Sequence, residues 1–466
     1  MKRLVAVLAS AALTAGLLIG GAGTAQAAAK KYRYKGDTFT YYVVPGGVEI
    51  GAVSSKDRKI TFPKAIGKRA VVQISLELSK SISKADFSRA TKLKVLELDG
   101  PYLGGKLDLS RNTKLTSLSL SSWSSKSTKV VLPKSKKLKN LWFSSNRGTG
   151  DKPAYTTDLS RASGLKTISL RYWSAWSTDP KRAWKLTGLT KLKQLTSLSL
   201  DGPTRSLDLT GSPKLDELLL RYSNLASLNL SGNPQLTSLS LDSWRLKNLD
   251  LSRNAKLTDL HLAFSPLASL KLDGNPRLQS LTLSQLPLTR VDLSRNPGLE
   301  FLYLDLPKLV AVNLSKQTAL QHLTVRDAAA LTTVDLGGPT RLESLNLDQL
   351  PKLTSVDLSK APRLNDLSLD DLPSLASVDL RHTPALSNLP DLLPKLTSLD
   401  VSQNRGLQSL RLSDLPKLTS LDVTANRELG TLWIYGVPIA QLDLRNNPLL
   451  DPDDGSLDVG DIPVIR

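Results

Sequence analysis

The sequence predicts a solenoid of short, stacked β-strands, and three observations support this prediction. From about Leu93 onward the phrase L-x-x-L-x-L returns, with Ile, Val or Phe occasionally in place of Leu. Two kinds of phrase alternate, so the full repeat is 21 or 22 residues long. A fixed period of this length indicates a repeat architecture. The step between phrases is 10 or 11 residues throughout, as the last apolar residues show: Leu209, Leu220, Leu230, Leu241, Leu251, Leu262, Leu272, Leu283, Leu293, Leu304, Leu314, Val325, Leu336, Leu347, Leu358, Leu369 and Leu380.

The two phrases form the two halves of each turn. The Asp half has the pattern LDLSRN, as at residues 249–254, and the variable half has patterns such as LTLSQLP at 281–287. In L-x-L the Leu side chains point to one face of a strand and the intervening residues to the other. A strand of this length is unstable alone, so stacked turns must merge their Leu side chains into one core. We expect about 15 or 16 turns over residues 93–449.

Composition supports an ordered chain. Of the 466 residues 40% are hydrophobic, mostly aliphatic, and 22% are charged, which excludes a disordered polar chain. The chain has no Cys, which excludes disulfides, thiolate zinc sites, a cysteine nucleophile and a lipidated cysteine.

The N-terminus has the pattern of a secretory signal peptide. Lys2 and Arg3 precede 16 apolar or small residues, and Ala25-Gln26-Ala27 suits signal peptidase. A retained anchor helix is the alternative, although the run is shorter than the roughly 20 residues that span a bilayer. We therefore predict residues 1–27 as a cleaved leader, no membrane insertion afterwards, and a secreted bacterial protein that reaches the medium or adheres loosely to the cell wall.

Residues at both ends depart from the period. Residues 28–92 contain short strand-like segments separated by turn signals such as Pro45-Gly46-Gly47, and are predicted to be a small β-rich cap over the open core. Residues 450–466 are predicted to cap the other end. A calcium loop at 451–455 is an alternative, but the carboxylates lack the spacing of an EF-hand.

An Asn follows the strand of the Asp half in many turns. A stacked Asn amide can bond the backbone of the turns above and below, so we predict a structural ladder. Its members are Asn112, Asn233, Asn254, Asn275, Asn296, Asn404, Asn426 and Asn447, and it lapses at Gln317, Pro339, Ala361 and Thr383.

With these phrases the sequence resembles the leucine-rich-repeat family, in the short nested 21 or 22 residue form of secreted bacterial, internalin-like surface proteins. The resemblance rests on some 28 phrases in register. It implies a right-handed coil whose concave sheet is formed by the strand that leads into the Asn, which places the Asp half on the concave side. A generic β-helix is the alternative fold.

The central outward position of the Asp half forms an acidic ladder. We expect its consecutive members to repel one another, which would raise their proton affinity or recruit cations. A solvated ladder with Ser and Arg partners is the favoured interpretation, and binding of divalent cations or cationic ligands is the alternative. The consecutive members are Asp335, Asp357, Asp379, Asp400, Asp422 and Asp443.

Enzymatic function finds no support in the sequence. Each ladder carboxylate has nearly the same neighbours, whereas acid and base catalysis needs two different environments. His261, His322 and His382 are scattered and are expected to be structural, and no nucleophile elbow, zinc-protease motif or phosphate loop is found. We predict neither a metal nor a cofactor.

Charge is segregated along the chain. Residues 28–94 carry a net charge of +10 and residues 95–194 carry +13, whereas residues 195–466 carry −5. The period breaks within the basic part, where the sequence has an insertion at about 171–194. Insertions in repeat proteins often lie on the binding side, so its aromatic and cationic residues are candidates for binding. Side chains of these types suit sugars, phosphates or sulfates. Packing in the turn layer is favoured for Trp123 and Trp244, and packing and binding are equal alternatives for Trp176 and Trp184. The candidates are Arg171, Tyr172, Trp173, Trp176, Lys181, Arg182 and Trp184.

These observations predict a secreted, non-catalytic recognition or adhesion protein that binds a protein or glycan through its repeat surface. The alternative is a wall-associated structural protein that its basic N-terminal third holds on an anionic cell-wall polymer. Nucleic acid is not expected as a physiological partner.

Overall fold

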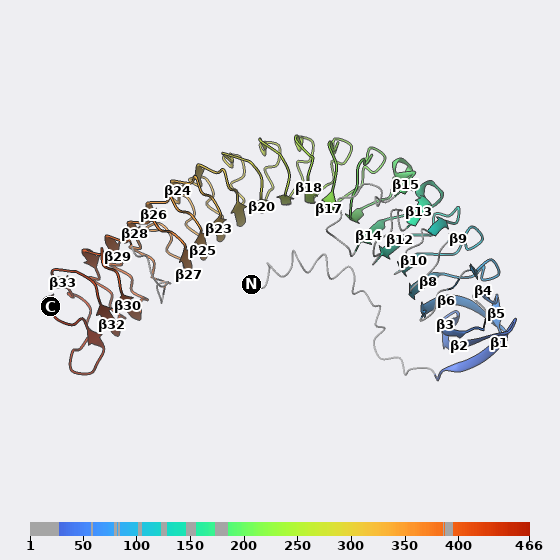
Figure 1. The fold of residues 1–466 in the computed structure, drawn as a ribbon, viewed down its shortest axis with the longest axis horizontal. Coiled ribbons are helices and arrows are strands. Elements are labelled where there is room, and N and C mark those ends of the chain that lie inside the picture. Colours follow the sequence, from blue (N-terminus) through green and yellow to red (C-terminus); the bar gives the residue numbers. More distant parts are fainter. Residues whose placement is uncertain are drawn as a thin grey trace.

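The computed structural model describes residues 28–56, 59–78, 82, 84–100, 105–122, 128–145, 155–172, 185–384, 386 and 395–466. They form a long arc of about 17 stacked turns with a concave and a convex face (Figure 1). The described residues contain many short strands and two short 3-10 helices, η1 (Leu159–Arg161) and η3 (Leu189–Lys191). The solenoid predicted from the repeat is confirmed.

The variable half of each turn forms the concave face, where neighbouring strands pair in parallel and in register (Figure 1). Most of these strands have five to seven residues. In chain order they are β8 (Val95–Gly100), β10 (Ser117–Ser122), β12 (Asn140–Ser145), β14 (Thr167–Tyr172), β16 (Ser197–Asp201), β17 (Glu217–Ser223), β18 (Ser238–Ser243), β19 (Asp259–Ala263), β20 (Ser280–Ser284), β21 (Phe301–Asp305), β23 (His322–Arg326), β25 (Ser344–Asp348), β27 (Asp366–Asp370), β30 (Ser409–Ser413), β32 (Thr431–Tyr435) and β34 (Leu457–Asp458).

The Asp half forms the convex face, in short strands that pair only in groups (Figure 1). Within the fully described stretch 185–384, this face has no strand between β15 and β22. The convex strands are β9 (Gly105–Asp108), β11 (Thr128–Val131), β13 (Tyr155–Asp158), β15 (Lys185–Thr187), β22 (Ala311–Asn313), β24 (Thr333–Asp335), β26 (Ser355–Asp357), β28 (Ser377–Asp379), β29 (Ser398–Asp400), β31 (Ser420–Asp422), β33 (Leu442–Asp443) and β35 (Val464–Ile465).

The expected placement of the Asp half on the concave side is therefore wrong. Its strands end early because the Asp carboxylate accepts the backbone N–H two residues on, as Asp357 Oδ1 at the end of β26 does from Ser359 N at 2.9 Å. The variable half stays extended for longer and holds its turns at the strand spacing of about 4.8 Å. The coil bends towards the side with the longer runs of paired strands, and the less extensively paired Asp half lies outside.

The N-terminal segment continues the sheet. The strands β1 (Lys30–Tyr34), β2 (Asp37–Val44) and β3 (Gly47–Ser54) are antiparallel, but β6 (Arg69–Glu77) pairs in parallel with both β3 and β8. On the other side β4 (Lys59–Thr61) pairs in parallel with β7 (Lys84–Asp86), while β5 (Ala65–Ile66) returns against β6. Repeat geometry thus starts before Leu93, which accounts for more turns than expected.

The core is one continuous column of apolar side chains. Leu side chains from both halves fill it, as Leu241 of the concave face and Leu251 of the convex face do, each 1% exposed. At its N-terminal end Phe62 stacks on Phe87, with ring centroids 4.5 Å apart, and packs at a tilt against Phe39, with ring centroids 5.6 Å apart. At the C-terminal end β34 and β35 continue the pairing to the last residues of the sequence.

The Asn ladder is buried and hydrogen-bonded. Asn254 Nδ2 donates to Leu230 O at 3.2 Å and Asn233 O at 2.9 Å, and Asn275 and Asn296 repeat this arrangement. The amide bonds the turn before it, and not the turns on both sides as we expected. At two lapses another side chain substitutes: Gln317 Nε2 donates to Leu293 O at 2.7 Å, and Thr383 Oγ1 donates to Leu380 O at 2.7 Å.

Candidate functional site

The predicted binding residues around the insertion are only partly described. Arg171 and Tyr172 end the concave strand β14, where Arg171 is half-buried and Tyr172 is 3% exposed. Burial makes Tyr172 a packing residue and not a ligand contact. Trp173, Trp176, Lys181, Arg182 and Trp184 lie outside the described residues, as does the predicted leader, residues 1–27.

The acidic ladder lies on the convex face, so its description as a concave ladder is wrong. In register with one another, Asp357, Asp379, Asp400 and Asp422 stand on β26, β28, β29 and β31. Each ladder carboxylate accepts the N–H two residues on, at 2.9 to 3.1 Å, in Asp335, Asp357, Asp379, Asp400, Asp422 and Asp443.

The ladder's electrostatics also differ from the expectation. Arg381 Nη2 lies 2.6 Å from Asp379 Oδ2, and Arg445 Nη2 lies 2.6 Å from Asp443 Oδ2. Partial burial opposes ionisation of Asp379, but hydrogen bonds from Arg381 outweigh it and lower its pKa. Hydrogen bonds from Arg445 lower the pKa of Asp443. The expected rise in proton affinity is wrong for these two carboxylates, because the neighbouring Arg and backbone N–H groups outweigh the repulsion.

The concave face is mostly lined by small polar side chains. Ser and Thr hold the first two outward positions of β10, β14, β16, β18 and β20. Larger outward side chains break this pattern at several strands, as Trp142 on β12, Leu219 on β17 and Arg411 on β30 do. Four of them lie together on the adjacent strands β21 and β23, where Phe301, Tyr303, His322 and Arg326 point outward; we call these four residues the central cluster. The rings of Phe301 and His322 are 6.5 Å apart. Sequence reasoning missed this cluster and treated His322 as structural; the phrase FLYL, which departs from the Ser-rich consensus, is the signal that marks it.

Charged partners hold the central cluster in place. Arg326 Nε lies 2.9 Å from Asp327 Oδ2, and its Nη2 lies 3.4 Å from Asp348 Oδ2. Burial raises the pKa of Asp348, with help from neighbouring Asp residues and against the opposing effect of Arg326. Burial and the nearby Asp305 likewise raise the pKa of Tyr303, which keeps its hydroxyl protonated. The cluster therefore combines aromatic faces, one fixed cation and one carboxylate, that of Asp348, which burial makes costly to ionise.

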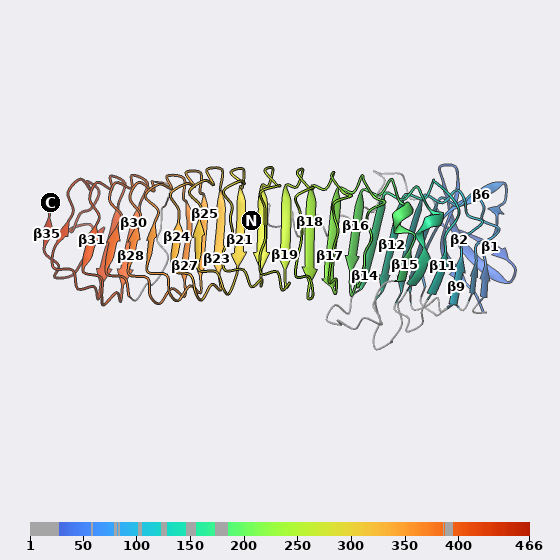
Figure 2. The ribbon, with the colours of Figure 1, turned by 90° about the horizontal axis from the view of Figure 1, so that it is seen from above.

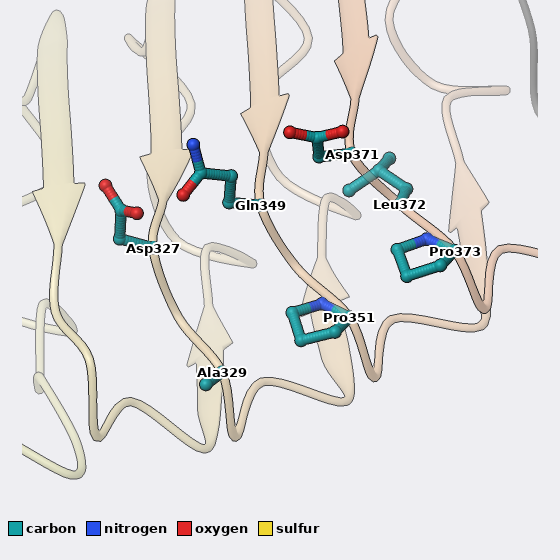
Figure 3. Close-up of a pocket in the computed structure, with 7 residues that line it drawn as sticks. All are labelled: Asp327, Ala329, Gln349, Pro351, Asp371, Leu372 and Pro373. Atoms are coloured by element: carbon teal, nitrogen blue, oxygen red, sulfur yellow. The ribbon is translucent and has the colours of Figure 1, made fainter.

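A groove of about 570 Å³ adjoins the central cluster where β23, β25 and β27 end (Figure 3). Asp327, Gln349 and Asp371 line it at corresponding positions of three successive turns, all with positive φ between 50° and 56°. Apolar walls come from Ala329, Pro351, Leu372 and Pro373. Left-handed backbone in residues other than Gly is uncommon, and here it recurs after several concave strands and in the convex turns at His382, Gln403, Ala425 and Asn446.

Further exposed aromatic residues lie elsewhere on the solenoid. Trp244 is 45% exposed and stacks on Phe264 at 5.2 Å, so the expected burial of Trp244 in the turn layer is wrong; Trp123 lies outside the described residues. At the C-terminal end of the concave face, Arg411 Cζ lies 4.3 Å from the ring centroid of Trp433, next to the 76% exposed Tyr435.

The described part of the chain offers little support for a metal site or a membrane-spanning helix. Within it, no group of three or more His, Asp or Glu residues has a metal-binding arrangement, and no helix is long and apolar enough to cross a membrane. His261 Nε2 lies 3.5 Å from Asp242 Oδ1. In the segment considered for calcium, Asp451 and Asp454 accept backbone N–H groups from Asp453 and Ser456.

Comparisons with known proteins agree with this architecture. No protein-family profile matches the chain, and no curated protein matches its sequence. The functional domain of InlJ from Listeria monocytogenes, which includes a cysteine ladder, is 22% identical with a TM-score of 0.50, covering 72% of this chain and 65% of that one. The chain thus spans less than two thirds of the InlJ domain. The fold is a leucine-rich-repeat solenoid.

A second solved structure is similar over a larger share of both chains. The leucine-rich-repeat protein LIC12759 from Leptospira interrogans is 15% identical with a TM-score of 0.45, covering 85% of this chain and 92% of that chain. The likeness at this level of identity concerns the fold.

Proposed function

We propose that this chain is a secreted, non-catalytic recognition protein that binds a protein partner on its concave face. One observation carries the proposal: two aromatic side chains, an imidazole and an Arg held by carboxylates lie together on the adjacent concave strands β21 and β23. Tyr and Arg are among the residues that dominate binding energy at protein interfaces, and solenoids use their curved surfaces for binding. The signal-peptide pattern at residues 1–27 supports export, and no residue set on the described surface supports catalysis.

A matched pair of arginines tests the proposal. Arg326 on the concave face and Arg381 on the convex face each contact two carboxylates and are similarly exposed, at 38% and 47%. For a protein captured by the wild type, we expect Arg326→Ala to weaken binding at least about 30-fold, or roughly 2 kcal/mol. Arg381→Ala should change it less than about twofold, as measured by surface plasmon resonance. Equal losses in the two variants would contradict a concave site. A glycan array run with the same variants tests a saccharide partner.

We propose retention on an anionic cell-wall polymer as a second candidate function, because the charge distribution favours it. The net charge of +23 on residues 28–194 against −5 on the remainder directs the N-terminal third towards a polyanion. The two functions are compatible, since the positive region precedes the central cluster along the coil.

A further inference from the structure

The turns that lead from the convex face into the concave strands all lie along one edge of the coil, because the concave strands run parallel (Figure 2). Five of these turns precede β8, β10, β12, β14 and β16. We call them the basic rim, and they comprise residues 88–94, 110–116, 133–139, 160–166 and 188–196.

The basic rim contains thirteen Lys or Arg residues and no Asp or Glu. The corresponding five turns that follow, at 210–216, 231–237, 252–258, 273–279 and 294–300, contain five basic and three acidic residues. The local fold is the same in both groups, so solenoid geometry does not require the uniform charge. Unopposed like charges repel, and a bound polyanion would remove that cost.

Backbone hydrogen bonds fix the spacing along the rim. Thr116 N donates to Lys94 O at 2.7 Å, Lys139 N to Thr116 O at 2.8 Å, and Lys166 N to Lys139 O at 2.8 Å. Successive turns therefore follow at about the strand spacing of 4.8 Å, and five turns span roughly 20 Å. The cations form a row along the axis of the coil.

The side chains of this row point to solvent. Lys92, Lys94, Lys114, Lys137 and Lys166 are exposed and Lys139 is half-buried. None of them forms an ion pair with another residue in the described part of the chain. Their ammonium groups are therefore available to an external anion.

The composition of the rim indicates the class of anion. Lys is a compact point charge that binds phosphate without the planar fork of Arg, and most of the rim cations are Lys. Single-stranded nucleic acid is normally held by aromatic side chains on which bases stack, and the five rim turns contain no Phe, Tyr or Trp. The rim thus fits a phosphate polymer that has no bases.

We propose that the basic rim binds a linear phosphate-diester polymer without bases, lying along the axis of the coil across four or five turns. The proposal rests on the second candidate function above and assigns that function to one edge of the solenoid. Binding would proceed largely by release of counterions from the polymer and would weaken steeply as salt rises.

Two matched charge reversals test the proposal. The rim variant carries Lys92→Glu, Lys114→Glu, Lys137→Glu and Lys166→Glu. The control carries Lys256→Glu, Arg277→Glu, Arg341→Glu and Arg363→Glu, all exposed residues in the same kind of turn further along the coil. Both lower the net charge by the same amount. If circular dichroism shows that the charge-reversed rim variant does not fold, a variant with Lys→Gln at the same four positions replaces it.

The probe is purified glycerol-phosphate wall polymer, titrated between 50 and about 300 mM salt. At low salt we expect the rim variant to bind at least about tenfold more weakly than the wild type. The slope of log affinity against log salt should decrease by about one unit for each contacting lysine removed. The control should stay within about threefold of the wild type.

The outcomes separate the rim from the broader function. Equal losses in the rim variant and the control would overturn the rim site while retention by net charge stands. Failure of the wild-type chain to bind the polymer would overturn both. Tighter rim-dependent binding of a single-stranded oligonucleotide with the same number of phosphates would overturn the assignment to a polymer without bases.

Discussion

Asp side chains on the two faces of this solenoid have pKa values that are shifted in opposite directions. On the convex face Asp108 accepts hydrogen bonds from Lys106 and Ser110, which lower its pKa to about 2, and backbone and hydroxyl donors lower the pKa of Asp250 and Asp292. On the concave face burial raises the pKa of Asp201 to about 6, and burial also raises that of Asp348. Convex carboxylates thus stabilise the turn that contains them, whereas these concave carboxylates cost stability. Groups retained at such a cost concentrate at functional sites.

The largest expected effect tests whether the two faces share one core. Leu251→Asp on the convex face and Leu241→Asp on the concave face each bury an unpaired charge in the same Leu column, and each should cost at least about 4 kcal/mol. Asp250→Ser, next to Leu251 but exposed, should leave the urea midpoint nearly unchanged because Ser can also accept the N–H of Ser252. Equal losses for Leu251→Asp and Asp250→Ser would contradict the alternation of inward and outward residues.

A smaller effect separates a structural amide from a surface amide. Asn254→Ala removes two hydrogen bonds to buried carbonyl groups of the preceding turn and should cost about 2 to 3 kcal/mol. Asn365→Ala, at an exposed position of the turn that leads into the concave strand β27, should cost less than about 0.5 kcal/mol. Urea unfolding of the two variants measures the difference, and similar costs would show that the convex Asn column does not support the coil.

The smallest effect is a difference in pH dependence. The pKa of Asp201 is near 6 in the folded chain and near 3.8 when unfolded, so the folded state binds more protons between these values. Its contribution to stability is present at low pH and is lost as pH rises through about 6. In the wild type, Asp201 should therefore lower the unfolding free energy as pH rises from about 4 to 6. The Asp201→Asn variant should not show this decrease. Asp208→Asn on the convex face should remove a term of opposite sign, because a lowered pKa stabilises the fold only above the unfolded value. Thermal melts from about pH 2 to 7 would check both, with the Asp208 difference expected below about pH 4 and the Asp201 difference between pH 4 and 6, and unchanged profiles would contradict the contrast.

Sequence reasoning predicted the periodic part of this molecule well. The L-x-x-L-x-L phrase determined the strands, the core positions and the buried Asn column, because each depends on local alternation and on contacts between equivalent residues of adjacent turns. Sequence reasoning nevertheless assigned the wrong half of the repeat to the concave side. Curvature depends on how far each strand stays extended. The carboxylate of Asp357 ends its strand by accepting the N–H of Ser359, an effect that the Leu pattern does not contain.

The candidate site was less accessible from the sequence. The central cluster combines Phe301 and Tyr303 with His322 and Arg326 from the next turn, and only stacking brings them together. The composition of the sequence points instead to the Trp-rich insertion and the Asp column. Departure from a repeat consensus at outward positions is a better guide than residue type alone, as FLYL among Ser-rich phrases shows.

The hydrogen bonds that each turn donates to the one before it also determine how the coil responds to force. From Thr116 N to Lys94 O, and at equivalent positions onward, every turn is held by the same kind of interface as the next. A pull along the axis loads these interfaces in series, and each turn contacts only its neighbours. The chain should therefore lengthen by successive release of single turns. A tether built this way dissipates a sudden load in many small steps and retains the remaining turns intact.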